Sequence, residues 1–137
     1  MKAALFLDDE SYRHVSFLKA QKENYDTIHC VSFNEDAIDL LKKFEYDLVS
    51  LDYDLTQTEG EGKSTLPTAA FIACMEKKPR LVRVHSRNYL AAPKLWEFLI
   101  NNGVNAYILE FGELEAYDKI ENLVGEEGDR DGNGPVC

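Results

Sequence analysis

Long apolar runs and positive charge are both scarce in this chain of 137 residues, which carries 15 Lys and Arg against 25 Asp and Glu. No apolar stretch approaches the roughly 20 residues that a helix needs to span a bilayer. The apolar segment near the N-terminus is too short for a signal peptide, because carboxylates follow it at once. We therefore expect no contact with a membrane and a cytoplasmic location.

The shortage of positive charge also bears on partners. A formal net charge of −10 disfavours tight, non-specific binding to a nucleic-acid backbone. It leaves open the recognition of one phosphorylated end in a local pocket, particularly a pocket that holds a metal ion. Cysteine is scarce as well: Cys30, Cys74 and Cys137 are too far apart for a paired zinc motif, and their odd number argues against a disulfide framework.

What the chain does contain is a regular alternation of short apolar runs and amphipathic segments. The expected strands are 3–7, 27–33, 48–56, 80–85 and 104–109, and the expected helices are 11–23, 34–44, 65–75, 89–101 and 113–124. This alternation predicts one α/β domain, residues 1–124, with a parallel sheet between two layers of helices. At this length the flavodoxin-like strand order 2-1-3-4-5 is the usual solution. The glycine-rich, charged residues 125–137 predict a flexible acidic tail.

Local signals refine the expected helices. Candidate N-caps are Asp9 or Ser11 for the first helix, Asn34 for the second and Thr65 for the third. The apolar positions of the first helix recur near the helical period at Tyr12, Val15, Phe17, Leu18 and Ala20.

Carboxylates end two of the expected strands. The run LVSLDYDLT ends on Asp52 and Asp54, and the run AALFL leads into Asp8 and Asp9. In the predicted strand order these four side chains meet at the switch point between the first and third strands. Four neighbouring carboxylates require a cation or raised pKa values, and oxygen ligands favour Mg²⁺, or Mn²⁺. The alternative is that Asp8 and Asp9 cap a helix and Asp54 belongs to a turn.

A second polar group ends the fourth strand, where LVRV leads into His85, Ser86 and Asn88. A histidine in this place could move protons to or from a phosphoester oxygen. Ser86 and Asn88 could donate hydrogen bonds to phosphate oxygens. The alternative is a histidine held in a tight turn, with Asn88 as a helix cap.

These residues resemble the receiver superfamily of response regulators, whose marks are an acidic pair after strand one, an aspartate at the end of strand three and a hydroxyl after strand four. The corresponding residues are Asp8, Asp9, Asp52 and Ser86. The resemblance implies Mg²⁺ bound by Asp9 and Asp52 with help from the backbone carbonyl of Asp54, and Asp52 as phosphoacceptor. Receivers carry a lysine after strand five, where this chain has Glu110.

The motifs are also similar to those of the cyclic-phosphate processing receiver-like family, which has LDD, LDHDL and HSxN at the same three strand ends. This chain has LDD at 7–9, LDYDL at 51–55 and HSRN at 85–88, so that Tyr53 stands in place of the family's histidine. The resemblance covers about residues 3–124. It implies an activity on cyclic phosphates.

Three functional hypotheses follow. The first is a metal-dependent phosphoesterase acting on a cyclic or terminal phosphate of a nucleotide or RNA end. Asp9 and Asp52 would hold the metal, with Asp8 and Asp54 in support; His85 would be the acid or base, and Ser86 and Asn88 would bind phosphate. The second is a non-catalytic receiver module with Asp52 as phosphoacceptor and a protein partner on the face formed by segments 89–101, 104–109 and 113–124. The third is a haloacid-dehalogenase-like phosphatase, because residues 52–56 match DxDx(T/V).

Overall fold

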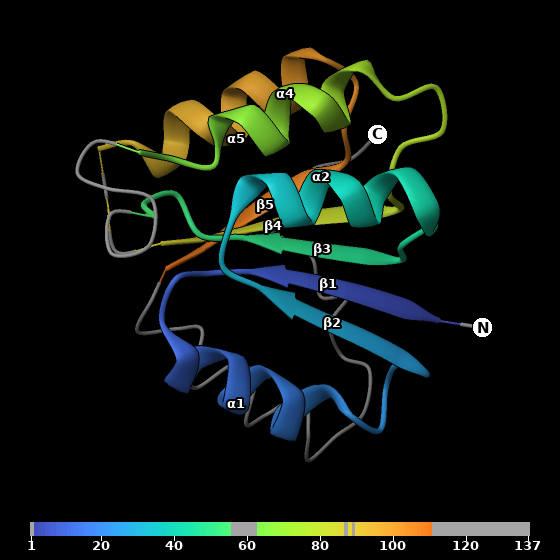
Figure 1. The fold of residues 1–137 in the computed structure, drawn as a ribbon. Helices are drawn as coiled ribbons and strands as arrows, with labels where there is room; N and C mark the ends of the chain where they lie inside the picture. The colour runs from blue at the N-terminus through green and yellow to red at the C-terminus, as the bar shows by residue number, and fades with distance from the viewer. Residues whose placement is uncertain (1, 56–62, 87, 89, 111–137) are drawn as a thin grey trace.

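A five-stranded parallel sheet forms the centre of the molecule (Figure 1). The computed structural model describes residues 2–55, 63–86, 88 and 90–110. The strands are β1 (Ala3–Leu7), β2 (Thr27–Val31), β3 (Leu48–Leu51), β4 (Leu81–Ser86) and β5 (Ala106–Glu110). Their order is β2-β1-β3-β4-β5, and every pairing is parallel. The predicted flavodoxin-like fold and strand order are confirmed.

Helices cover both faces of this sheet. The described helices are α1 (Ser11–Gln21), α2 (Asn34–Lys43), α4 (Leu66–Cys74) and α5 (Ala92–Asn101). Helix α1 lies on one face, and α2, α4 and α5 lie on the other (Figure 1). The helix predicted at 113–124 and the tail predicted at 125–137 lie outside the described residues. Within the part of the chain that is described, no helix is long and apolar enough to cross a membrane.

The central strands are apolar because both of their faces are buried. Every residue of β1 and β3 is buried, as expected for a parallel sheet between two helical layers. Side chains alternate between the faces, so Leu5 and Leu7 join the core beneath α2, α4 and α5. Phe6 points to the other face and stacks on Phe17 of α1, with ring centroids 4.4 Å apart. The two layers of helices are therefore anchored through one strand.

Two expected strands end earlier than their apolar patterns suggest. The third strand ends at Leu51 instead of continuing to residue 56, because Asp54 leaves the sheet to form an antiparallel bridge with Ser64. The second ends at Val31, two residues before the predicted end. The turn after β3 leaves Asp52 at the strand end, where its carboxylate can face a ligand.

Two of the predicted helix caps are wrong. The N-cap of α1 is Glu10, not Asp9 or Ser11, and the N-cap of α2 is Phe33, not Asn34. Asn34 instead lies inside α2 and connects it to α4. Its side-chain amide donates to the carbonyl of Ser64 (2.8 Å) and its carbonyl accepts from Thr68 Oγ1 (2.6 Å). The side chain of Asn34 therefore makes long-range hydrogen bonds instead of capping its own helix.

Thr65 is the N-cap of α4, as predicted, but its side chain makes no capping hydrogen bond. The hydroxyl of Ser64 accepts the N–H of Leu66 instead, at 3.2 Å.

The buried face of α1 also differs from the apolar pattern. Tyr12, Val15 and Leu18 are 48%, 51% and 40% exposed, although all three are among the apolar positions that recur near the helical period. The buried positions are Arg13, Phe17, Ala20 and Gln21, which follow the spacing i, i+4, i+7, i+8. The helix is thus rotated so that an arginine points toward the sheet.

Candidate functional site

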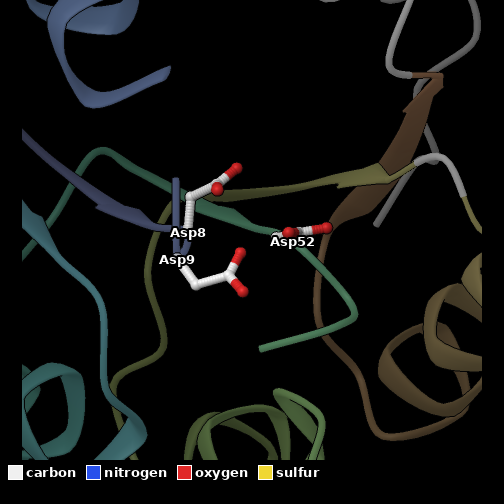
Figure 2. Close-up of side chains that lie close together, drawn as sticks. All are labelled: Asp8, Asp9 and Asp52. Carbon is white, nitrogen blue, oxygen red and sulfur yellow. The ribbon is translucent and has the colours of Figure 1, made fainter. Parts of the chain in front are cut away.

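Three carboxylates converge at the C-terminal edge of the central strands. Asp8, Asp9 and Asp52 each place an oxygen within 4.8 Å of the others (Figure 2). The parallel register explains this convergence, because Leu7 of β1 is paired with Leu51 of β3 and the next residues are Asp8 and Asp52. Asp8 is 0% and Asp52 5% exposed, while Asp9 is half-buried and open toward solvent. A set of carboxylate oxygens with one solvent-facing side suits a hard divalent cation such as Mg²⁺.

Asp54 lies outside this group of three. Its Oδ2 accepts a hydrogen bond from Asn88 Nδ2 at 3.2 Å. The contact links the turn after β3 to the turn after β4. The side chain of Asp54 therefore supports the rim of the site, and its expected part in metal binding rests on its backbone carbonyl.

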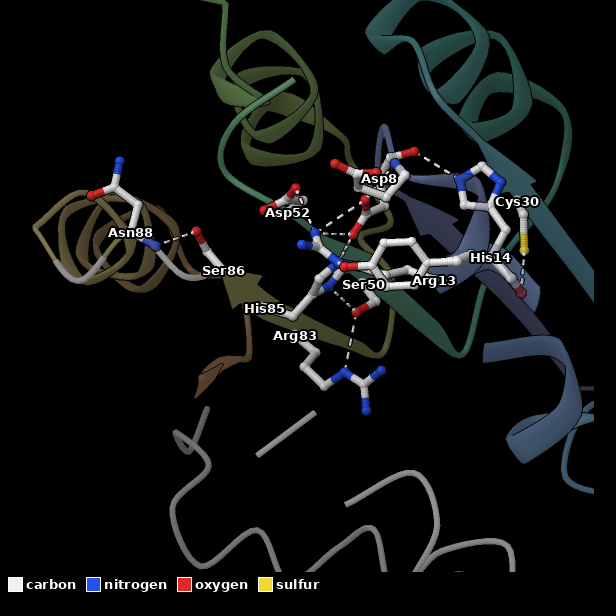
Figure 3. Close-up of polar contacts among 12 residues, drawn as sticks. Asp8, Arg13, His14, Cys30, Ser50, Asp52, Arg83, His85, Ser86 and Asn88 are labelled. Carbon is white, nitrogen blue, oxygen red and sulfur yellow. Dashed lines mark hydrogen bonds and ion pairs between the residues drawn. The ribbon is translucent and has the colours of Figure 1, made fainter. Parts of the chain in front are cut away.

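Arg13 supplies a positive charge in the middle of the site. Its Nη1 lies 3.0 and 3.3 Å from the two carboxylate oxygens of Asp8 and 3.3 Å from Oδ2 of Asp52 (Figure 3). Only 7% of the residue is exposed. Our sequence reasoning did not identify Arg13. The available signal was its spacing, because Arg13 precedes the buried Phe17 by one helical turn.

His85 lies on the side of Asp8 that faces the protein interior, not on the side from which a ligand would approach. The ring is 0% exposed and stacks parallel to Phe6, with centroids 4.7 Å apart. Its Nε2 is 2.9 Å from Asp8 Oδ2, and its Nδ1 is 2.7 Å from Ser50 Oγ. Because an ionised Asp8 can only accept, Nε2 carries the proton and Nδ1 accepts from the serine hydroxyl. Both ring nitrogens are thus used inside the protein, and the geometry favours a positioning role for His85 over contact with a substrate.

The hydrogen-bond chain behind Asp8 extends further into the core. Arg83, which is 0% exposed, donates from Nε to Ser50 Oγ at 3.1 Å. Each group in the series Arg83, Ser50, His85 and Asp8 donates to the next (Figure 3). The backbone N–H of Glu10 also donates to Asp8 Oδ1, at 2.8 Å. Asp8 is therefore fixed in place before any ligand binds.

The surroundings give the two buried carboxylates opposite pKa shifts. Burial works to raise the pKa of Asp8, but the hydrogen bond from His85 and the charge of Arg13 outweigh it, so this pKa is lowered. Burial and the negative charges of Asp8 and Asp9 raise the pKa of Asp52 to about 8, against the opposing effect of Arg13. Burial also lowers the pKa of His85, despite the neighbouring Asp8, so the ring is neutral.

Ser86 and Asn88 form the turn that leads from β4 into α5. The hydroxyl oxygen of Ser86 accepts the N–H of Asn88 at 3.0 Å. Asn88 Oδ1 accepts from the N–H groups of Leu90 (3.1 Å) and Ala91 (2.9 Å). The N-cap of α5 is Ala91, so the alternative of Asn88 as helix cap is wrong. The carbonyl oxygen of Asn88 instead stabilises the turn before the helix, and its amide donates to Asp54 Oδ2.

A groove of about 640 Å³ lies at the other end of the sheet. It is lined by residues that precede β3 and β4, among them Lys42, Phe44, Lys77 and Arg80. None of the predicted site residues lines it. The chemistry expected from the sequence belongs to the carboxylate edge.

The chain is similar to several solved structures of receiver domains. The response regulator TrrA from Thermotoga maritima, crystallised in complex with Mg(2+)-BeF, is similar with a TM-score of 0.62 and 25% identity, covering 90% of this chain and 100% of that one. A CheY-like receiver domain from Methanospirillum hungatei has a TM-score of 0.64 and 12% identity, covering 95% and 98%. The N-terminal domain of a response regulator/sensory box/GGDEF protein from Carboxydothermus hydrogenoformans has a TM-score of 0.64 and 20% identity, covering 96% and 98%. The fold is that of a response-regulator receiver domain.

Within that class, the sequence matches the model of the cyclic-phosphate processing receiver domain over residues 3–101, which is more than half of the chain. The chain belongs to this family, as its motifs suggested. No curated protein sequence matches it.

Proposed function

We propose that this domain is a receiver-type module in which Asp52 accepts a phosphoryl group with the help of a divalent cation. The observation that carries the proposal is the convergence of Asp8, Asp9 and Asp52 at the carboxyl edge of β1 and β3. The similarity to a receiver crystallised with Mg(2+)-BeF supports it. Asp9 and Asp52 would hold the cation, which is Mg²⁺ or Mn²⁺, together with the backbone carbonyl of Asp54.

The proposed reaction uses the strand-end position of Asp52. One of its carboxylate oxygens forms a bond to the phosphorus of a small donor such as acetyl phosphate. The donor's P–O bond breaks, and acetate leaves with the electron pair. The cation, when bound, neutralises charge on the phosphoryl oxygens. The hydroxyl of Ser86 is oriented by Asn88 N–H and can donate its hydrogen to a phosphoryl oxygen.

Labelling with acetyl phosphate or phosphoramidate tests this function. We expect a mass increase of one phosphoryl group that requires Mg²⁺ and is lost in Asp52→Asn. Asp54→Asn is the matched control, because Asp54 follows the same strand but its side chain lies outside the group of three carboxylates. The control should still be labelled. Unlabelled wild-type protein at saturating Mg²⁺ would contradict the proposal.

The family description favours a second candidate, a metal-dependent phosphoesterase acting on a cyclic or terminal phosphate of a nucleotide or RNA end. In this case the cation site is the same and Ser86 and Asn88 bind phosphate oxygens. His85 contributes by holding Asp8, which is fixed at 2.9 Å from its Nε2. Hydrolysis of 2′,3′-cyclic nucleotides with Mg²⁺ or Mn²⁺ is the test. Turnover that is lost in both Asp52→Asn and His85→Gln supports it, and absence of turnover excludes it.

A protein partner separates the two candidates further. A signalling module should bind its partner through the face that includes α5 and β5, and phosphorylation should change the affinity. A phosphoesterase needs no such partner. Chemical shift changes that extend from the phosphorylated site to residues 90–110 would favour signalling.

A further inference from the structure

The position of Arg13 raises a question about how a cation enters the site. The guanidinium nitrogen Nη1 contacts three oxygens of two aspartates at 3.0–3.3 Å. One of these oxygens, Asp52 Oδ2, belongs to a carboxylate that the proposed function assigns to a divalent cation. The site therefore already contains a positive charge that belongs to the protein itself.

A divalent cation and this guanidinium compete for the same place. A Mg²⁺–oxygen bond is about 2.0–2.1 Å long, and Mg²⁺ requires near-octahedral ligands. A cation bonded to Asp52 Oδ2 would lie close to Nη1, which is only 3.3 Å from that oxygen. The two like charges repel because Arg13 and Asp52 are both buried, where the effective dielectric constant is lower than in water. A divalent cation therefore cannot bind to Asp52 Oδ2 while the Arg13 guanidinium keeps its present position.

The two sides of Arg13 have different neighbours. Toward the sheet, the helix that carries it is fixed by Phe17, which is 0% exposed and stacked on Phe6. On the other side, Arg13 lies over the ring of Tyr12, with its guanidinium carbon 5.5 Å from the ring centroid, and Nε donates to the Tyr12 hydroxyl at 3.3 Å. Tyr12 is 48% exposed, so this side of Arg13 borders solvent. This is the side toward which the arginine head would move if it left the carboxylates.

Asp8 stays bound to the protein during such a movement. It keeps the hydrogen bonds from His85 Nε2 (2.9 Å) and from the backbone N–H of Glu10 (2.8 Å) when Arg13 leaves. Asp52, by contrast, has Arg13 as its cationic partner at 3.3 Å. The exchange of Arg13 for a divalent cation would therefore act mainly at Asp52.

We propose that Arg13 is a tethered cation which neutralises the carboxylate site in the metal-free protein, and which a divalent cation displaces from Asp52 when it binds. This inference rests on the metal binding of the proposed function, but not on phosphoryl transfer or turnover. The measured metal affinity then reflects how much more strongly the site binds the divalent cation than the guanidinium of Arg13. It also gives the metal-bound site a mobile guanidinium at its rim.

Two measurements with Mg²⁺ alone as the probe test the exchange. In the wild-type protein, the Nε–H signal of Arg13 is followed by ¹H–¹⁵N NMR, with the assignment taken from side-chain correlations that connect it to the backbone resonances of Arg13. We expect this signal to shift and to lose protection from solvent exchange along the same saturation curve as metal binding. This measurement needs no variant and so does not depend on whether a variant folds.

The second measurement compares Mg²⁺ affinity by isothermal titration calorimetry. Arg13→Gln should bind Mg²⁺ at least about tenfold more tightly than wild type, because the competing charge has gone. Arg80→Gln is the control: it makes the same change in net charge at an exposed residue that lines the groove at the other end of the sheet. It should change the affinity by less than about twofold, because surface charges at this distance are screened.

The outcomes distinguish this inference from the proposed function. If Mg²⁺ saturates the site while the Arg13 signal stays unchanged, or if Arg13→Gln binds Mg²⁺ no more tightly than Arg80→Gln, the exchange is excluded and the proposed function stands. If Mg²⁺ does not bind at all, both are excluded. A moving Arg13 signal together with tighter binding in Arg13→Gln supports the exchange, whatever the result of the phosphorylation assay.

Discussion

At the scale of single residues, the candidate site is supported by buried polar side chains that are hydrogen-bonded to one another. His85 and Ser50 are both 0% exposed, and they connect Arg83 to Asp8 through hydrogen bonds of 2.7–3.1 Å. A polar chain of this kind is stabilising only while every group keeps its partner, because an unpaired buried donor or acceptor keeps its full desolvation cost. The precision of the carboxylate site thus depends on residues that no ligand touches.

Ser50→Ala tests that dependence. The substitution removes the hydrogen bond to His85 Nδ1 (2.7 Å) and the acceptor of Arg83 Nε (3.1 Å). We expect the free energy of unfolding to fall by about 1–3 kcal/mol, measured by urea denaturation. Ser16→Ala, on the exposed face of α1, should leave stability unchanged or slightly raised, since alanine is the better helix former. Equal stability of the two variants would mean that the chain of hydrogen bonds contributes nothing.

Cys30 provides a pH-dependent test of burial. Burial raises the pKa of its thiol to about 11. Since the thiolate is the reactive form, alkylation of Cys30 should be slow at pH 8 and should accelerate about tenfold per pH unit until the pH approaches this pKa. The rate is measured with iodoacetamide in a protein where Cys74 and Cys137 are replaced by serine. Cys74, which is exposed, is the comparison when Cys30 and Cys137 are replaced instead. Rapid alkylation of Cys30 at pH 8 would show that the β2 edge opens readily.

At the scale of elements, local sequence patterns predicted the strands and helices but not how the helices are turned. The apolar runs placed β1 and β3 because a buried parallel strand is apolar on both faces. The same reasoning counted Phe17 and Ala20 of α1, which are buried, together with Tyr12 and Val15, which are exposed, and it did not include Arg13. Burying Arg13 is favourable only because it pairs with Asp8 and Asp52. Asp52 is 39 residues away in the chain. No local pattern contains that information.

The sequence likewise predicted one part of the candidate site and not another. The carboxylates could be predicted because parallel strands bring their carboxyl ends to one edge, which follows from topology alone. The direction of His85 could not, because it depends on which face of β4 the ring occupies and on Ser50 of the neighbouring strand. The Asn34 cap failed for a similar reason: the tie to Thr68 joins residues 34 positions apart.

That tie between helices is itself testable. Asn34→Ala removes both hydrogen bonds that connect α2 to the start of α4. We expect a loss of about 1–3 kcal/mol, because the hydroxyl of Thr68 is buried and loses its acceptor. Asp39→Ala, at an exposed position of α2, should cost much less. Thermal unfolding followed by circular dichroism compares the two, and a loss no greater than that of Asp39→Ala would show that the helices are joined by apolar packing alone.

At the scale of the whole molecule, the site joins the two central strands of the sheet. Asp8 and Asp9 follow β1 and Asp52 follows β3, so a ligand bound to all three connects the N-terminal and C-terminal parts of the sheet. Such a ligand binds the folded state alone, because the unfolded chain does not assemble the three carboxylates. Its binding therefore adds directly to global stability.

Mg²⁺ should accordingly raise the midpoint of thermal unfolding. At a concentration of about 100 times the dissociation constant, the stabilisation is about 2.7 kcal/mol. Differential scanning calorimetry measures it, with Asp52→Asn expected to lose the increment and Asp54→Asn expected to keep most of it. The same increment in all three proteins would place metal binding somewhere other than the carboxylate edge.

The stacked rings of Phe17, Phe6 and His85 affect the NMR spectrum of the domain. Phe6 lies between Phe17 and His85, at centroid distances of 4.4 and 4.7 Å, and its ring is parallel to that of His85. Ring currents in Phe6 must then displace the imidazole proton resonances of His85 upfield. His14 meets the Phe6 ring at 86° and His29 meets the Phe44 ring at 53°, so the parallel stack distinguishes His85 from both. The domain thus contains a natural spectroscopic reporter, one hydrogen bond away from Asp8, that needs no added label.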